Sequence, residues 1–294
     1  MTTATRSNFF DMTSDAGFRT IGSNMNAMLA ATGLVQTSDT GQINWTTVTK
    51  PGAANTSAGY EIWQFTDSVG SIYCKLEYGT GTNATQPGWW VTFGTGSNGS
   101  GTLTGYTTTR QETQPGFAAS STTTNFPSYA CATTGAFWAL IGVGASGAKA
   151  FMVFGCARTC DSTGAVTGDG FEAFQSTAAN NSQHAVINLS NGNTYSQNGI
   201  NPAICMIPMA ISSSNYGTGG NNIYQVVRHE LPMPQIFTSA FIGTALQAEA
   251  GAATTTTMAI VGSTNHTFLF AGQLSGSQAW NASTALGQLV LIYE

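Results

Sequence analysis

Carboxylates are the first side chains in this sequence whose type and spacing would support catalysis. They form three groupings: Glu61 with Glu77, Asp67 with a distant partner, and Asp161 with Asp169 and Glu172. Glycoside hydrolysis uses two carboxyl groups roughly 5 to 9 Å apart across a sugar-binding cleft. Glu61 and Glu77 fall on neighbouring candidate strands, but Lys75 lies beside them, and a cross-strand ion pair is the simpler explanation. We therefore predict no enzyme activity and no catalytic residue.

Metal ligands are the second class of candidate. Asp161 and Asp169 would hold Ca²⁺ with threonine and carbonyl oxygens, but the segment lacks the acidic density of an EF-hand loop, and a hairpin turn accounts for both. Cys156 and Cys160 lie four residues apart, whereas a zinc site needs two further ligands. The histidines are remote in sequence and unpatterned: His184, His229 and His266. The sequence thus predicts buried free thiols, no metal and no cofactor.

Two further motifs are weak. Residues 228–230, Arg-His-Glu, form the densest charged cluster, which would act either as an acid–base or pH-sensing group or as a salt bridge near a subunit contact. Gly94, Gly96 and Gly99 match the bare Gly-x-Gly-x-x-Gly spacing, but more Thr/Gly-rich chain follows them instead of a helix. Neither motif predicts a nucleotide site.

Aromatic side chains are the remaining candidates for ligand binding. Trp63, Trp89, Trp90 and Tyr78 would include stacking platforms for a sugar if two or more of their rings were exposed and coplanar. The alternative is that these rings belong to the hydrophobic core, which strand alternation favours for Tyr78. Both interpretations stay open at this point, with the three tryptophans as the candidate ligand-binding residues.

The elements that would position these side chains are mostly strands. Residues 72–78 alternate apolar and polar side chains, which is typical of a strand with one buried face. Residues 60–65 and 89–93 are aromatic and β-branched, and turn-forming segments connect the three. We predict an antiparallel meander with an aromatic core.

A helix is expected before the meander. Ser14 or Asp15 would cap it, and Gly33 would end it in the left-handed conformation. Its apolar residues recur at helical spacing: Phe18, Ile21, Met25, Met28 and Leu29. That stripe predicts a helix lying on the β core, with a short intersubunit contact as the alternative.

The rest of the chain reads as further strands and loops. Residues 1–13 resemble a polar arm, residues 43–48 a strand, and residues 177–200 an Asn/Ser/Gln-rich loop. Strands are also expected at residues 136–143, 150–156, 203–211, 235–242, 257–262, 266–270 and 289–293. From residue 157 we expect a strand, a turn at residues 161–164 and a return strand toward Phe174. The predicted fold is mainly β, with antiparallel sandwich-like modules and one N-terminal helix. The predicted division is residues 1–35 for arm and helix, 36–125 for a first β module, and 126–294 for a second.

The composition restricts the class of protein. Only 7% of the residues are charged, against about 25% in an ordinary soluble domain. The eight Lys and Arg residues are scattered singly, so no nucleic-acid partner is expected. We also expect no membrane span and no export signal, since no apolar run is long enough. A polar but uncharged surface packs against protein without the desolvation of ions, which favours a subunit of an assembly.

Several segments resemble an uncharacterised family of tailed-bacteriophage virion proteins, best over residues 15–105. They are residues 18–23, 33–37, 39–45, 58–63, 75–81 and 94–99. The resemblance implies a particle component, and it carries over no catalytic or ligand-binding residue. We expect a homo-oligomer that contacts other virion proteins in the tail, neck, baseplate or head decoration, assembled in the host cytoplasm. The alternatives are an adhesin that binds a host surface glycan and, third, a polysaccharide depolymerase.

Overall fold

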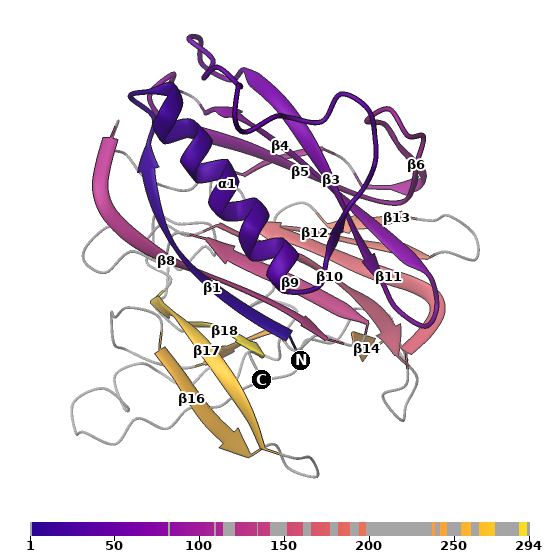
Figure 1. Cartoon of the computed structure of the whole chain (residues 1–294). Coiled ribbons are helices and arrows are strands. Elements are labelled where there is room, and N and C mark those ends of the chain that lie inside the picture. Colours follow the sequence, from indigo (N-terminus) through magenta and orange to yellow (C-terminus); the bar gives the residue numbers. More distant parts are fainter. Residues whose placement is uncertain are drawn as a thin grey trace, which may run out of the picture.

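The computed structural model describes the chain in segments. They are residues 2–81, 83–108, 110–113, 121–133, 135–141, 152–160, 166–176, 182–188, 194–197, 237–238, 242–245, 254–259, 265–273 and 288–292. These residues form antiparallel sheets and one α-helix near the N-terminus (Figure 1), which confirms the predicted fold class. No helix of this part is long and apolar enough to cross a membrane.

The predicted meander is the centre of a six-stranded sheet. Its order is β2 (Val35–Gln36), β3 (Ser57–Thr66), β4 (Ser71–Thr80), β5 (Pro87–Ser97) and β6 (Leu103–Thr107), with β7 (Gln111–Thr113) also paired to β5. Along β4 the apolar residues are buried and the intervening ones half-buried, because successive side chains point to opposite faces. The alternation seen in the sequence is confirmed.

A larger, eight-stranded sheet contains the N-terminal strand. Its order is β1 (Thr2–Asp11), β8 (Ser121–Thr133), β9 (Ala136–Ile141), β10 (Met152–Cys160), β11 (Val166–Ser176), β12 (Ser182–Asn188) and β13 (Thr194–Gln197), with β14 (Phe237–Thr238) paired to β10. The prediction of a polar arm over residues 1–13 is wrong, because β1 pairs with β8.

The loop predicted at residues 177–200 is also wrong in part. Strands β12 and β13 lie within it, and β12 pairs with β11 from Gly170 to Ser176. Polar residues suit loops on average, but pairing with a neighbouring strand overrides that local preference.

A four-stranded sheet is formed by the C-terminal part. Its order is β15 (Ile242–Ala245), β18 (Gln288–Ile292), β17 (Asn265–Gln273) and β16 (Thr254–Ala259). Three strands predicted at 257–262, 266–270 and 289–293 overlap β16, β17 and β18. The strand predicted at 203–211 and the charged cluster at 228–230 lie outside the described residues.

The six- and eight-stranded sheets share one hydrophobic core. Phe137 of β9 packs against Phe65 of β3 and Phe93 of β5, with ring centroids 5.6 and 6.1 Å apart. Phe154 and Phe171, which are fully buried, complete the same cluster from β10 and β11. This is the packing of a sandwich, in which inward-facing side chains of two sheets interdigitate. The division at residue 125 stays a prediction.

The helix α1 (Asp15–Ala31) packs along β1 (Figure 1), and the sequence signals for both of its ends are confirmed. The Ser14 hydroxyl caps the helix by accepting from the Gly17 N–H at 3.0 Å. Gly33 follows with φ of 91°, which a residue with a Cβ rarely adopts. The predicted stripe is the buried face, with Phe18, Ile21, Met25 and Met28 at most 2% exposed.

Candidate functional site

Glu61 is fully buried on the inner face of β3, and its carboxylate is the centre of a hydrogen-bond network that we call the Glu61 hub. Its Oε1 accepts from Asn26 Nδ2 at 2.9 Å, Trp45 Nε1 at 2.8 Å and Gln36 Nε2 at 3.5 Å. Its Oε2 accepts from the Tyr78 hydroxyl at 2.8 Å and Trp63 Nε1 at 3.2 Å. The hub thereby joins α1, β2, β3, β4 and the loop that carries Trp45.

The surroundings of the hub favour the protonated form of the Tyr78 hydroxyl. Burial raises the pKa of Tyr78 well above its ordinary value, and the charge of Glu61 and the hydrogen bond to it raise it further. Hydrogen bonds to an ionised acceptor are about twice as strong as neutral ones. Because both oxygens face protein donors and the side chain has no exposed surface, the arrangement is that of a structural centre and offers a substrate no access.

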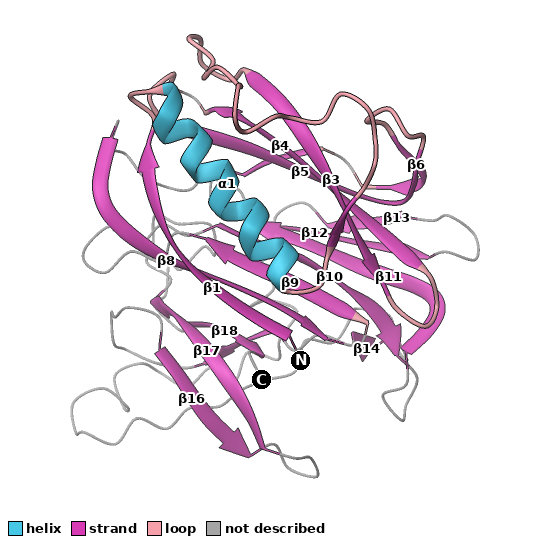
Figure 2. Cartoon of the chain, in the orientation of Figure 1, coloured by secondary structure: helices cyan, strands magenta, loops and turns pink. Residues whose placement is uncertain are grey.

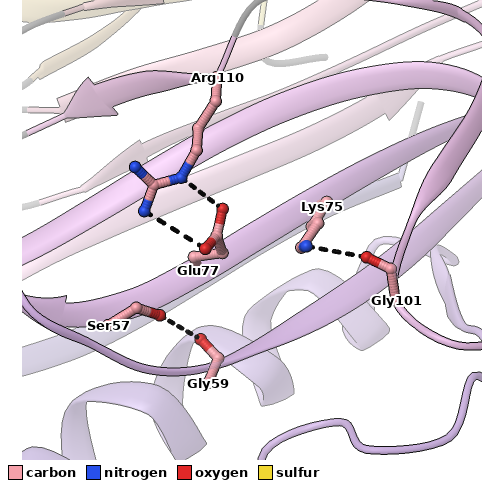
Figure 3. A network of polar contacts seen from close by, with 6 residues as sticks. All are labelled: Ser57, Gly59, Lys75, Glu77, Gly101 and Arg110. Atoms are coloured by element: carbon pink, nitrogen blue, oxygen red, sulfur yellow. Dashed lines mark hydrogen bonds and ion pairs between the residues drawn. The ribbon is translucent and has the colours of Figure 1, made fainter.

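The expected pairing of Glu61 with Glu77 or Lys75 is wrong. Glu61 is opposite Leu76 and Glu77 is opposite Tyr60, so the two carboxylates lie on opposite faces of the sheet. On the outer face, Glu77 accepts from Arg110 Nε at 2.7 Å, and Lys75 Nζ donates to the Gly101 carbonyl at 2.8 Å (Figure 3). Leu76, which shares a face with Glu61, and Glu77 are consecutive in β4, so their side chains point to opposite faces.

On the outer face of the sheet, two cationic side chains also lie over aromatic rings. The Arg110 guanidinium lies 4.4 Å from the centroid of the Trp90 ring, and the Lys75 ammonium lies 4.6 Å from that of Tyr60. Both distances are in the range of cation–π attraction. Trp90, which lies under Arg110, is only 4% exposed.

The candidate stacking residues are buried. Trp63 is 1% exposed, Trp89 2% and Tyr78 1%, and with Trp90 they present no exposed coplanar pair of rings. Trp63 and Tyr78 donate to Glu61, and Tyr78 contacts Trp89 edge-on at 5.9 Å. The rings belong to the core, so the condition set for sugar stacking is not met in this structure.

Asp67, considered above for a carboxylate pair with a distant residue, instead forms an ion pair with Arg158. Its Oδ2 accepts from Arg158 Nε at 3.0 Å, and both side chains are 2% exposed. Its Oδ1 accepts from the N–H groups of Val69 and Gly70, at 2.9 and 3.1 Å. A single carboxylate therefore shapes the β3–β4 turn and ties it to β10, which indicates a structural role.

The other sequence candidates give no metal or nucleotide site in the described part. Cys156 is a buried free thiol, as predicted, and burial raises its pKa. Among the described side chains, no group of three or more His, Cys, Asp or Glu could hold a metal ion. Gly94 and Gly96 lie in β5, and Gly99 with φ of 80° follows in the turn to β6, so the glycine motif opens no helix. Asp161 and His229 lie outside the described residues.

Residues 37–56, between β2 and β3, form a long connection that we call the anchored loop (Figure 2). The strand predicted at 43–48 is wrong. Asn44 instead makes a turn, because its Oδ1 accepts from the Thr46 N–H at 2.9 Å and its carbonyl accepts from the Val48 N–H at 2.9 Å. Irregular loops longer than about 12 to 15 residues are uncommon in compact domains and are usually functional when ordered.

The first part of the loop is held by Asp39, which sequence reasoning missed. Its carboxylate accepts from the hydroxyls of Ser97 and Thr37, at 2.5 and 2.7 Å, and from the Gly101 N–H at 3.0 Å. Burial opposes the charge of Asp39, but these hydrogen bonds outweigh it and lower the pKa below the ordinary 3.8. The bonds tie the loop to the β5–β6 turn.

The middle of the loop is held by Trp45. Its ring edge contacts Phe18 and Tyr78, with centroids 5.5 and 4.9 Å away, while its Nε1 donates to Glu61. The ring lies so close to Gly22 of α1 that a Cβ there would come within 2.1 Å of it. The missing side chain of Gly22 thus makes room for the Trp45 indole against α1. In the sequence, the only sign of this contact is a single glycine within a helical pattern.

The last part of the loop is held by charged residues and backbone bonds. Arg19 Nε donates to the Val48 carbonyl at 2.7 Å, and the Lys50 N–H donates to Asp15 Oδ1 at 2.9 Å. Lys50 Nζ donates to the Ala84 carbonyl at 3.2 Å, and the Asn55 N–H donates to the Gly81 carbonyl at 2.7 Å. The loop therefore contacts α1 at one side and the β4–β5 turn at the other.

Comparisons with protein-family models, with characterised proteins and with solved structures find no match to this chain.

Proposed function

We propose that this protein is a structural subunit of a tailed-phage virion, which acts by self-association and by contacts with neighbouring virion proteins. The main support for this proposal is the bonding of the charged side chains. Each charged side chain that the structure describes has a hydrogen bond or ion pair within the chain itself. These residues are Asp11, Asp15, Arg19, Asp39, Lys50, Glu61, Asp67, Lys75, Glu77, Arg110 and Arg158.

The described charged side chains are few and bonded within the chain, so the exposed polar side chains are mostly hydroxyls and amides. Removing an unpaired ion from water is expensive, whereas hydroxyls and amides exchange water for protein partners at small net cost. The centres of protein–protein interfaces are accordingly depleted of Lys, Glu and Asp. Over the whole chain, only 7% of the residues are charged. Together with the resemblance to virion proteins, it supports a subunit whose working state is an assembly.

No observation favours the two alternatives. The adhesin would need exposed rings, and Trp63, Trp89 and Trp90 are buried. The depolymerase would need a carboxylate pair in a cleft, and Glu61 and Glu77 lie on opposite faces of their sheet.

The mass of the purified protein tests the proposal first. Light scattering across a concentration series should show a stable closed oligomer, such as a trimer, pentamer, hexamer or larger ring. Because the contacts would be neutral, the mass should stay the same at low and high salt. A monomer at every concentration contradicts self-association.

The particle itself supplies the second test. Phage particles whose genome encodes this chain should contain it at a fixed copy number, measured by quantitative mass spectrometry of purified virions. Particles that are infectious and lack the protein would overturn its role as a virion component.

A further inference from the structure

Two buried thiols lie on opposite sides of the core that the six- and eight-stranded sheets share. Cys74 belongs to β4 and Cys156 to β10, both are part of the one hydrophobic cluster, and they are 1% and 0% exposed. We propose that Cys74 and Cys156 form a redox-sensitive pair, which closes into a disulfide between the two sheets when the protein meets an oxidising thiol–disulfide buffer. Both thiols lie in one chain, so the inference does not depend on the proposed function.

The position of the Phe137 ring places the two thiols close together. β4 lies between β3 and β5, and its Cys74 is opposite Phe93 of β5. Phe137 of β9 contacts Phe65 of β3 and Phe93, so its ring lies over the part of β4 that carries Cys74. Cys156 is the partner of Phe137 on the neighbouring strand. One strand spacing, about 5 Å, therefore separates Cys156 from the residue whose ring lies over Cys74.

The ion pair between Asp67 and Arg158 ties β10 to the turn from which β4 begins. Arg158 follows Cys156 by two residues and so shares its face of β10, and its Nε donates to Asp67 Oδ2 at 3.0 Å. Burial raises the pKa of the Cys74 thiol well above its ordinary value, and Cys156 raises it further, which agrees with two thiols close enough to interact. A sandwich accommodates such a crosslink, since a disulfide joins the two sheets of antibody domains.

The chemistry of closure is thiol–disulfide exchange with a small disulfide such as oxidised glutathione. The thiolate of one cysteine attacks a sulfur of the small disulfide, and one reduced glutathione leaves. The second cysteine then loses its proton and displaces the other glutathione, so the protein gives up two electrons and two protons and the small disulfide gains them. Because burial raises the pKa of both thiols, we expect closure to be slow and to proceed through brief opening of the sandwich.

The test compares which cysteines pair in the folded and in the unfolded chain. The full chain is equilibrated with oxidised and reduced glutathione, with and without high urea, then alkylated, digested and mapped by mass spectrometry. In the unfolded chain, loop closure favours cysteines that are near in sequence, such as Cys156 and Cys160. In the folded chain, the Cys74–Cys156 disulfide should be enriched by on the order of tenfold or more over the unfolded chain, because the fold holds the two thiols together.

Two alanine variants provide the controls. Cys156→Ala should abolish the folded-state disulfide of Cys74. Cys131→Ala should leave the Cys74–Cys156 disulfide intact, because Cys131 is equally buried but is opposite Trp138, which follows Phe137 and so faces away from the shared core. Oxidised wild type should also unfold at a higher urea concentration than reduced wild type. Folded protein in which Cys74 stays reduced, or pairs with Cys156 no more often than in high urea, would overturn the inference.

Discussion

Glu61 and Glu77 lie on opposite faces of the six-stranded sheet, and their carboxylates are held in opposite ways. Glu61 on the inner face is fully buried and bound by neutral donors from five residues. Glu77 on the outer face is bound by Arg110, whose side chain is 47% exposed. We expect the outer ion pair to stabilise the fold less than the Glu61 hub, because water screens the exposed pair while burial strengthens each bond to Glu61.

Replacing Glu61 should therefore have the largest effect. In Glu61→Gln, an amide N–H₂ takes the place of one acceptor oxygen and faces donors, and the charge that strengthens the other bonds is lost. We expect a loss of at least about 4 kcal/mol in the free energy of unfolding, measured by urea denaturation. A loss below about 1 kcal/mol would contradict the hub as the organising centre of this face.

Breaking the Asp67–Arg158 pair should cause the next largest loss of stability. This pair is both ionic and buried, so it separates the effect of burial from that of charge in the contrast between Glu61 and Glu77. Arg158→Met leaves the Asp67 carboxylate buried without its cation, with an expected loss of about 3 kcal/mol or more in unfolding free energy. The double variant with Asp67→Leu should recover part of that loss. If the losses of Arg158→Met and Asp67→Leu simply add up in the double variant, the two charges are not coupled.

Acid should loosen the anchored loop through Asp39. Its pKa in the folded state lies below 3.8, so its stabilising contribution is complete above that pH and is lost as the pH falls through the folded value. The unfolding free energy of wild type minus that of Asp39→Asn should be about 1 to 2 kcal/mol at neutral pH and should shrink on acidification below 3.8. Taking the difference between the two proteins removes the contribution of the other carboxylates to the pH dependence. A difference that stays constant with pH would contradict a stabilising role of the Asp39 charge. The Gly101 amide shift in NMR should follow the same titration.

The smallest effect is expected on the outer face. Glu77→Gln should lower the unfolding free energy by less than about 1 kcal/mol, and high salt should reduce the difference further. The same urea titration as for Glu61→Gln makes the two variants a matched pair. A loss as large as that of Glu61→Gln would remove the contrast between the faces.

The meander and the helix could be predicted from sequence because their signals are local. A period of two over residues 72–78 and a helical stripe ending at Gly33 are properties of consecutive residues. The strand at β1 could not be predicted in this way. It is polar and pairs with β8, whose partner residues begin at Ser121, so only a long-range contact makes it a strand.

Sequence by itself thus determined the fold class, the buried face of β4 and both ends of α1. Tertiary structure alone decided what the polar residues do. Trp45 and Asn26 reach Glu61 across 16 and 35 positions of the chain, and Arg158 reaches Asp67 across 91. The physical reason is that backbone periodicity assigns a side chain to a face, whereas the partner of a buried polar group is set by which distant elements pack against that face.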